Sequence, residues 1–356
     1  MYRERALATA LLALMLAACG SQTTTTGDDP VTAQPALPSG WRWESFGGVE
    51  VGVPGTWGWG DSGLRLDAWC INSASRDKSP VVARPGEAIP AIGCGDGGTS
   101  LANTGPVVGL GHAFIIDGPD PASSAIPTAA PGFYDPAPDG VTREGDRTTI
   151  HLSGVEVVIQ AAPALREQIA VTVHRVDIDA NGCPATHPLS LNPALRPTPP
   201  TDLTALPGAA AVSVCRYELR SSFAGKQGKP GLLSSLRLTG AKAEKALQAI
   251  TRTPSGSGPD QPDNCAPEEA YGEQAIVLRI FPQTTRTPTE LFVRYAGCTH
   301  HGFDDGTRLH QLTQTALDPF TTGPNAVMTF LTPPPQTIAS APPTRTATSS
   351  GDNKGG

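Results

Sequence analysis

The chain has 356 residues and a formal net charge of −7, and its 39 glycines and 36 prolines together make up 75 residues, or 21%. Charged residues (17%) and aromatic residues (5%) are scarce, but an apolar fraction of 38% is enough for a core. The composition therefore predicts a loop-rich globular protein and not a wholly disordered chain. Because the balance of charge is acidic, no nucleic-acid partner is expected.

The first 19 residues carry an export signal. Two arginines lie within the first five residues, and Ala6 to Ala18 is an uninterrupted stretch of 13 apolar or small residues. As a helix it would span roughly 20 Å, short of a hydrocarbon core of about 30 Å, so residues 1–18 are predicted to be a cleavable signal peptide and not a transmembrane helix. The stretch ends in Leu16-Ala17-Ala18-Cys19, which resembles the lipobox of bacterial lipoproteins. The resemblance implies acylation of Cys19 and a lipid anchor at the outer face of the cell membrane; a plain secretory signal with a chance cysteine is the alternative.

Six cysteines follow Cys19, namely Cys70, Cys94, Cys183, Cys215, Cys265 and Cys298. An even number of cysteines in an exported chain predicts three disulfides. Sequence alone leaves the pairing open, and we favour pairing of neighbours in chain order. Each bond would then contribute about 3–4 kcal/mol in the chain-entropy model. A zinc site is not favoured because the chain has no C-x-x-C spacing, and no cofactor is expected.

Two hairpins are predicted in the N-terminal half. Strands over 41–46 and 49–53 flank Gly47-Gly48, which supplies the positive φ angles of a two-residue turn, and strands over 148–152 and 155–159 flank Ser153-Gly154. The other elements expected here are strands over 66–71, 81–83 and 170–176 and a helix over 163–169.

The C-terminal half has a clearer pattern. It predicts strands over 211–219, 232–238, 275–281 and 291–296. Thr239 is placed to cap a helix from Gly240 to about Arg252, and Leu309, Leu312, Ala316 and Leu317 mark one face of a closing helix. Because strands and helices do not alternate regularly, we expect an α+β fold of two small antiparallel-sheet modules with few short helices, stapled by disulfides.

The composition also predicts how the chain is divided. Segments of low hydrophobicity at both ends are expected to be disordered, and a segment rich in proline should connect the modules. The predicted parts are the signal peptide (1–18), a tether (19–39), an N-terminal module (40–183) with an internal loop (117–140), a connector (184–210), a C-terminal module (211–332) and a tail (333–356).

Several short motifs combine cysteines with turn residues and core aromatics, and they are spread over most of residues 40–332. The motifs are Trp69-Cys70, Ala83-Arg84-Pro85-Gly86, Ile92-Gly93-Cys94, Val214-Cys215-Arg216-Tyr217, Leu238-Thr239-Gly240, Cys265 and Val293 to Cys298. They resemble motifs of a family of exported lipoproteins of high-GC Gram-positive bacteria whose function is not known. The resemblance implies export and disulfides, and it implies no activity.

The segment His300-His301-Gly302-Phe303-Asp304-Asp305-Gly306 is the strongest candidate for chemistry. Two imidazoles lie close in sequence to two carboxylates, a combination that suits metal binding or acid–base catalysis. Asp305-Gly306 is also a strong turn signal, and neighbouring residues in a strand point to opposite faces. We therefore favour a solvated turn beside a disulfide, and keep a cell-envelope hydrolase with a site at His300, His301, Asp304 and Asp305 as the alternative.

Three other motifs favour structural interpretations. Asp177-Ile178-Asp179-Ala180-Asn181-Gly182 matches the first half of a calcium loop, but Pro188 occupies the position of the bidentate glutamate, so a turn is predicted. Gly60-Asp61-Ser62-Gly63 has no histidine before it and is predicted to be a surface turn. Residues 93–98 satisfy G-x-G-x-x-G, but no helix is expected to follow, so a disulfide-bearing loop is predicted.

All five tryptophans lie within 29 positions, at Trp41, Trp43, Trp57, Trp59 and Trp69. Each i, i+2 pair would share a face if it lay in a strand. We favour a core role, and an exposed platform for a glycan or peptide is the alternative. The function expected from the sequence is that of a lipid-anchored envelope protein that binds a ligand, an envelope glycan or a protein partner outside the membrane. The sequence favours this binding role over an enzymatic one, which it leaves open.

Overall fold

The computed structural model describes residues 36–64, 69–71, 79–85, 101, 105–112, 114–116, 134–203, 206, 209–219, 231–283, 287–326 and 337. Residues from Leu37 onward belong to one unit. Among the described residues, no helix combines the length and the apolar character that crossing a bilayer requires.

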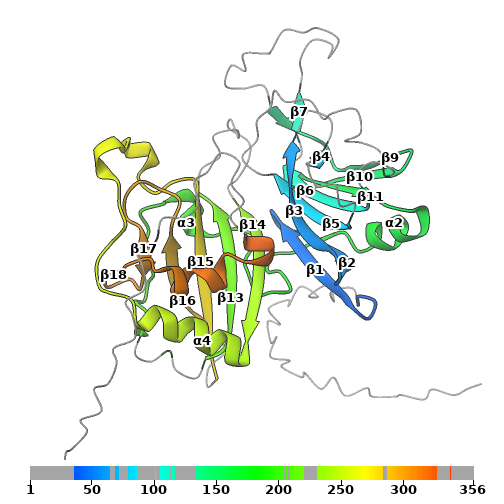
Figure 1. Cartoon of the computed structure of the whole chain (residues 1–356). Coiled ribbons are helices and arrows are strands. Elements are labelled where there is room, and N and C mark those ends of the chain that lie inside the picture. The colour runs from blue at the N-terminus through cyan, green and yellow to red at the C-terminus, as the bar shows by residue number, and fades with distance from the viewer. Residues whose placement is uncertain are drawn as a thin grey trace, which may run out of the picture. The chain divides into compact units, whose positions relative to one another are not determined.

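The N-terminal half is built from strands (Figure 1). One sheet has three strands in the order β1-β2-β12, a second has seven in the order β4-β3-β5-β6-β11-β10-β9, and β7 pairs with β8. The strands are β1 (Trp41–Phe46), β2 (Val49–Pro54), β3 (Gly58–Leu64), β4 (Trp69–Ile71), β5 (Val81–Pro85), β6 (Val107–His112), β7 (Phe114–Ile116), β8 (Tyr134–Pro136), β9 (Gly140–Glu144), β10 (Arg147–Leu152), β11 (Val155–Gln160) and β12 (His174–Arg175).

The C-terminal half has one antiparallel sheet of six strands in the order β14-β13-β15-β16-β17-β18. These strands are β13 (Ala209–Glu218), β14 (Leu232–Thr239), β15 (Gln274–Pro282), β16 (Thr289–Arg294), β17 (Gly302–Asp304) and β18 (Leu309–His310). The helices are α2 (Pro163–Ala170), α3 (Pro188–Leu191), α4 (Gly240–Thr251), α5 (Gln314–Leu317) and the 3₁₀ turns η2 (Pro262–Asn264), η3 (Pro267–Glu269), η4 (Asp318–Phe320) and η5 (Gly323–Asn325).

Both predicted hairpins are present with the expected turns. β1 pairs with β2 around Gly47-Gly48, where both glycines have positive φ, and β10 pairs with β11 around Ser153-Gly154, where φ is 55° and 79°. Two successive positive φ angles match the twist of the flanking strands, which is why these dipeptides set the register. The α+β class with few short helices is confirmed.

The seven-stranded sheet departs from the antiparallel expectation. β3 pairs with β5, and β5 with β6, in parallel. A parallel pair needs a long crossover between its strands, and the hydrophobic pattern of a strand does not reveal its direction. Gly60-Asp61-Ser62-Gly63, predicted to be a surface turn, lies inside β3.

Helix α4 covers one face of the six-stranded sheet, as Figure 1 shows. Its buried residues follow the spacing of one helical face and pack on the apolar residues of β13, β15 and β16. These helix residues are Ala243, Ala246, Leu247 and Ile250. Thr239 precedes the helix as predicted, but its side chain makes no capping hydrogen bond.

Two other predicted elements are wrong. The closing helix is only α5, and Leu309 lies in β18 instead, because the turn at Asp305-Gly306 folds residues 309–310 back onto β17. The strand over 170–176 shrinks to the two residues of β12, because Thr172 closes a turn after α2 by donating its hydroxyl to the Ile169 carbonyl. Of the predicted 117–140 loop, residues 117–133 lie outside the described part and residues 134–136 form β8.

The opposite face of the six-stranded sheet is covered by residues 177–201, which we call the strap. The Cys183–Cys215 disulfide joins the strap to β13 with a Cα–Cα distance of 5.5 Å, and the Tyr217 hydroxyl donates to the Pro184 carbonyl at 2.8 Å. Leu189 of α3 is fully buried against this face. The segment predicted to be a connector is therefore irregular in backbone but forms a packed layer of the fold.

Two of the three disulfides expected from chain-order pairing are present. Besides Cys183–Cys215, Cys265 is bonded to Cys298 across 33 positions. Cys70 lies in β4, and its expected partner Cys94 lies outside the described residues, as do Cys19, the signal peptide and the 93–98 motif.

A buried polar junction joins β1, β14 and the strap. Asp179 of the strap accepts hydrogen bonds from Ser45 of β1 at 2.8 Å, from Ser235 of β14, and from the Cys183 backbone N–H at 2.7 Å. Glu50 of β2 accepts from the Ala180 backbone N–H at 2.6 Å. Because every one of these carboxylates is buried, the bonds offset desolvation and fix where the halves meet.

Gly182 is held at this junction in a conformation that excludes any side chain. Its φ is +87°, and a Cβ atom would lie 2.9 Å from Ser213 Oγ and 3.0 Å from Arg237 Nη1. Gly154 has a similar φ of +79°, but a Cβ atom there would meet nothing within 4 Å. A side chain at Gly154 would therefore meet only backbone strain, whereas a side chain at Gly182 would meet backbone strain and steric crowding together.

We expect Gly154→Ala to lower the free energy of unfolding by about 1 kcal/mol, from backbone strain alone. Gly182→Ala should cost about 2–3 kcal/mol because Ser213 and Arg237 must also move. Urea denaturation of both variants measures the difference. Equal losses would show that the junction yields to a methyl group without cost.

Candidate functional site

The candidate histidine–aspartate segment forms the β17–β18 hairpin at one edge of the six-stranded sheet. The predicted turn is present: Asp305 Oδ1 accepts from the backbone N–H groups of Thr307 at 2.6 Å and Arg308 at 2.7 Å, and Gly306 has a φ of +89°. Both aspartates are buried, however, so the turn is not the solvated one expected.

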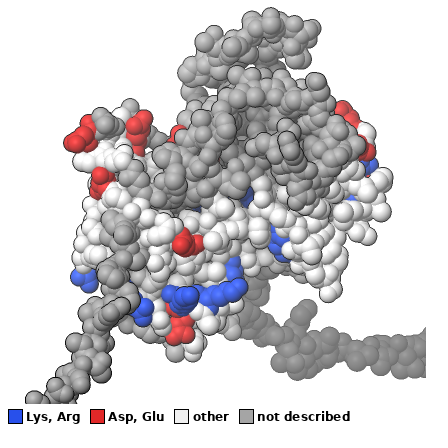
Figure 2. All heavy atoms as spheres, viewed as in Figure 1, with Lys and Arg blue, Asp and Glu red and all other residues white. Residues whose placement is uncertain are grey.

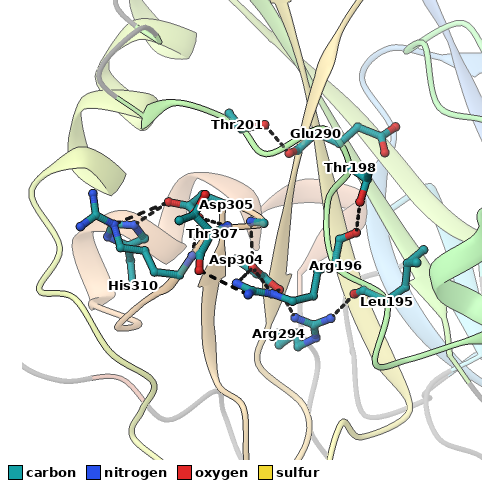
Figure 3. A network of polar contacts seen from close by, with 12 residues as sticks. Leu195, Arg196, Thr198, Thr201, Glu290, Arg294, Asp304, Asp305, Thr307 and His310 are labelled. Carbon is teal, nitrogen blue, oxygen red and sulfur yellow. Dashed lines mark hydrogen bonds and ion pairs between the residues drawn. The ribbon is translucent and has the colours of Figure 1, made fainter.

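Asp304 is clamped between two arginines (Figure 3). Arg294 of β16 donates Nη1 to Oδ2 at 2.6 Å, Arg196 of the strap donates Nε to both carboxylate oxygens at 3.1 Å, and the Gly306 N–H donates to Oδ1 at 2.9 Å. Burial alone would raise the pKa of Asp304, but these donors outweigh it and hold the pKa below its usual value. The carboxylate therefore stays ionised as an anchor for the strap.

Arg294 extends the clamp to the strap backbone. Its Nη2 donates to the carbonyls of Pro193 and Leu195, as Figure 3 shows for Leu195. The guanidinium also lies 5.3 Å from the ring centroid of Tyr271. One buried cation thus satisfies two carbonyls that would otherwise be unpaired beneath the strap.

A second pair, His187 and Glu290, fixes the strap further along the sheet. His187 Nδ1 accepts the Leu189 N–H at 3.1 Å, so Nε2 carries the proton that it donates to Glu290 at 3.2 Å. Burial alone would raise the pKa of Glu290, but His187 and Arg279 lower it below its usual value. In Figure 3 the Glu290 carbonyl also accepts from Thr201, at 2.6 Å.

The histidines of the segment do not converge on its aspartates. His301 is buried with Nδ1 on the Pro259 carbonyl and 3.5 Å from Asp260, while His300, with a φ of +60°, stacks on Tyr271 at 4.6 Å. The aspartate that does have an imidazole partner is Asp305, whose Oδ2 lies 3.1 Å from Nε2 of His310.

Nucleophilic catalysis needs a hydroxyl or thiol beside a base, and a metal site needs several converging ligands. In the described ranges, no hydroxyl or thiol is hydrogen-bonded to His301 or His310, and no group of three or more His, Cys, Asp or Glu side chains is placed to hold a metal ion. The 177–182 segment likewise forms a turn, in which Asp179 binds the chain's own donors. At these residues the structure shows ion pairs and hydrogen bonds within the fold.

The tryptophans do not all have the same role: one is a core residue and another is partly exposed at the surface. Trp57 is in the core, whereas 41% of Trp59 is exposed, and the side chain of Trp69 lies outside the described part. Trp59 donates Nε1 to Glu44 at 2.8 Å, and Arg42 lies 4.3 Å from its ring centroid. The indole is therefore held by polar partners.

Glu44 also belongs to a buried ion pair that the sequence did not reveal. Arg84 donates Nη2 to Glu44 at 2.7 Å and Nε to the Leu233 carbonyl of β14 at 3.0 Å. Burial raises the pKa of Glu44, but Arg84 and Arg42 lower it below its usual value. No local pattern signals this pair, because its members are 40 positions apart.

Comparison of the chain with protein-family models, with curated proteins and with solved structures finds no match.

We expect Asp304→Asn to lower the free energy of unfolding at pH 7 by about 3–5 kcal/mol, because it leaves Arg294 buried without its counter-ion. Since the fold depresses the pKa of Asp304, its contribution is complete above the unfolded value of 3.8 and is lost as the pH falls further. When the pH is lowered from about 5 to about 3, the free energy of unfolding should therefore fall less in the variant than in the wild type.

Chemical denaturation at several pH values measures this. Asp146→Asn, which removes the same charge from an exposed turn, is the control and should leave both the stability and its acid dependence unchanged. Parallel pH curves for wild type and Asp304→Asn would contradict the role of Asp304 as an ionised anchor. Arg196→Gln provides a milder test, because 43% of that side chain is exposed.

Proposed function

We propose that this protein is an exported lipoprotein, anchored through Cys19 to the outer face of the cell membrane, whose folded part binds a ligand or partner there. The supporting observation is the pair of disulfides, Cys183–Cys215 and Cys265–Cys298. Disulfides persist in oxidising compartments and are rare in the cytosol. Together with Leu16-Ala17-Ala18-Cys19 they favour export over an intracellular role.

We favour binding over hydrolysis because both candidate catalytic aspartates have structural partners. Asp304 is bonded to Arg196 and Arg294, and Asp305 holds the turn backbone and His310. A hydrolase at this hairpin would have to give up the contacts that fix the strap. The folded part is therefore proposed as a rigid module, held near the membrane by its anchor, for an envelope glycan or a protein partner.

Replacing Cys19 tests the anchor. In bacteria that acylate lipoproteins, the wild type should fractionate with membranes and give an N-terminal peptide that begins at Cys19 and carries acyl chains by mass spectrometry. Cys19→Ala should lose the acyl mass, because the thiol is the acceptor. The double variant Cys265→Ser/Cys298→Ser is the matched control and should keep it. A wild-type chain that begins at Met1 without acylation would rule the anchor out.

A thermal-shift screen of the intact protein tests ligand binding. A ligand that binds only the native state should stabilise it by about 2.7 kcal/mol at 100 times its Kd. The panel contains cell-wall fragments, simple glycans, calcium and zinc, with EDTA as a control for bound metal. A shift with glycans alone would support the envelope-binding proposal. A shift with a metal alone would contradict the expectation that no metal is bound.

A further inference from the structure

The charges of the C-terminal half are segregated along the chain. Residues 220–252 contain seven Lys or Arg residues and a single acid, Glu244, although the whole chain has a net charge of −7. Residues 253–278 contain five acids and no Lys or Arg. Blocks of opposite sign in consecutive segments indicate a surface with distinct basic and acidic parts.

Helix α4 presents the basic part on the surface. Its exposed basic residues are Lys242, Lys245 and, at the C-cap, Arg252. The face of the helix that packs on the sheet is apolar. None of the three has an ion pair within 4 Å with a described residue, and the single acid, Glu244, accepts a hydrogen bond from Gln248. These cations are therefore not neutralised by the described part of the fold.

Figure 2 shows the segregation on one face of the molecule. Lys and Arg side chains gather over the region where Figure 1 has α4, and Asp and Glu side chains gather over the yellow segment that contains η2 and η3. The acids of that segment include Asp260, Asp263 and Glu269. Near a negatively charged surface, such a distribution favours the orientation of the protein in which the basic part faces that surface and the acidic part faces away.

We propose that the exposed face of α4 docks on the anionic lipid headgroups of the membrane to which the chain is anchored. The proposal depends on the proposed lipid anchor at Cys19. Seventeen positions separate Cys19 from Ala36, the first described residue, and whatever their conformation they span at most about 60 Å. The anchor thus keeps the folded part near the headgroups, and a few cations are then enough to set its orientation.

The docking turns the acidic η2–η3 segment away from the bilayer. A basic residue near an anionic membrane surface strengthens binding by about fivefold, so two of the three cations account for at least about a tenfold change. Salt should weaken the contact, because exposed charges are screened within about 8 Å at physiological ionic strength.

Lysine reactivity in the anchored protein tests this. The acylated full chain is inserted into vesicles of neutral phosphatidylcholine, or of the same lipid with about one-third phosphatidylglycerol, and modified with an amine-reactive acetylating reagent. Mass spectrometry then follows Lys242 and Lys245, with Lys354 as internal reference. We expect both lysines to react about tenfold more slowly on the anionic vesicles, and this protection to disappear at about 0.5 M salt.

Matched charge variants identify the surface responsible. Lys245→Gln/Arg252→Gln leaves Lys242 as the reporter and should abolish its protection on anionic vesicles. Arg143→Gln/Arg166→Gln removes the same charge from β9 and α2, where Arg143 is exposed and Arg166 is half-buried, and should leave the protection of Lys242 intact. Loss of protection in both variants would show an effect of net charge and overturn the assignment to α4.

The remaining outcomes separate the docking surface from the anchor. Equal reactivity on both vesicles, with the protein floating with both, would overturn the docking surface and leave the anchor standing. Flotation with anionic vesicles only, with Lys242 protected, would support the docking surface and contradict the anchor. Protection of Lys242 by soluble polyphosphate as strong as that by vesicles would assign the face to an anionic polymer and overturn the choice of lipid.

Discussion

The carboxylate of Asp179 accepts hydrogen bonds from three separate parts of the chain. The donors are the Ser45 hydroxyl of β1, the Ser235 hydroxyl of the edge strand β14 and the backbone N–H of Cys183. Cys183 also forms the disulfide with β13. A buried carboxylate is costly unless its lone pairs are satisfied, so the three donors must be delivered together. The placement of the N-terminal strands against the C-terminal sheet depends on this condition, and the Glu44–Arg84 pair repeats the arrangement on the next part of β1.

The strap is held on the sheet mainly by charge and hydrogen bonds. Arg294 and Arg196 bind Asp304, and His187 binds Glu290, so buried polar groups on the sheet face meet polar groups on the covering segment. Apolar contact is limited to residues such as Leu189 around the disulfide. These contacts fix the position of the strap on the sheet, because a shifted strap would leave several buried charges without partners. The same contacts occupy the Asp304 carboxylate, one of the four side chains that sequence proximity had suggested for catalysis.

Local signals in the sequence predicted what local physics controls. The Gly47-Gly48 turn, the extent of α4 and the Asp305-Gly306 turn are set by neighbouring residues, and the sequence identified all three. The parallel pairing of β3, β5 and β6 was missed because strand direction leaves no trace in alternation. The clamp on Asp304 was missed because Arg196 is 108 positions away. Sequence adjacency also grouped His300 and His301 with the aspartates, whereas the backbone turns them toward Tyr271 and Pro259.

The strap precedes in sequence all the strands of the sheet that it covers, so it is synthesised before them. The Cys183 thiol therefore has to remain free until Cys215 of β13 has been made. Seven prolines between residues 184 and 208 make this stretch a poor former of helices and sheets. Because proline cannot donate a backbone hydrogen bond to a neighbouring strand, the prolines that make the strap irregular in the native protein also disfavour wrong strand pairings in the nascent chain.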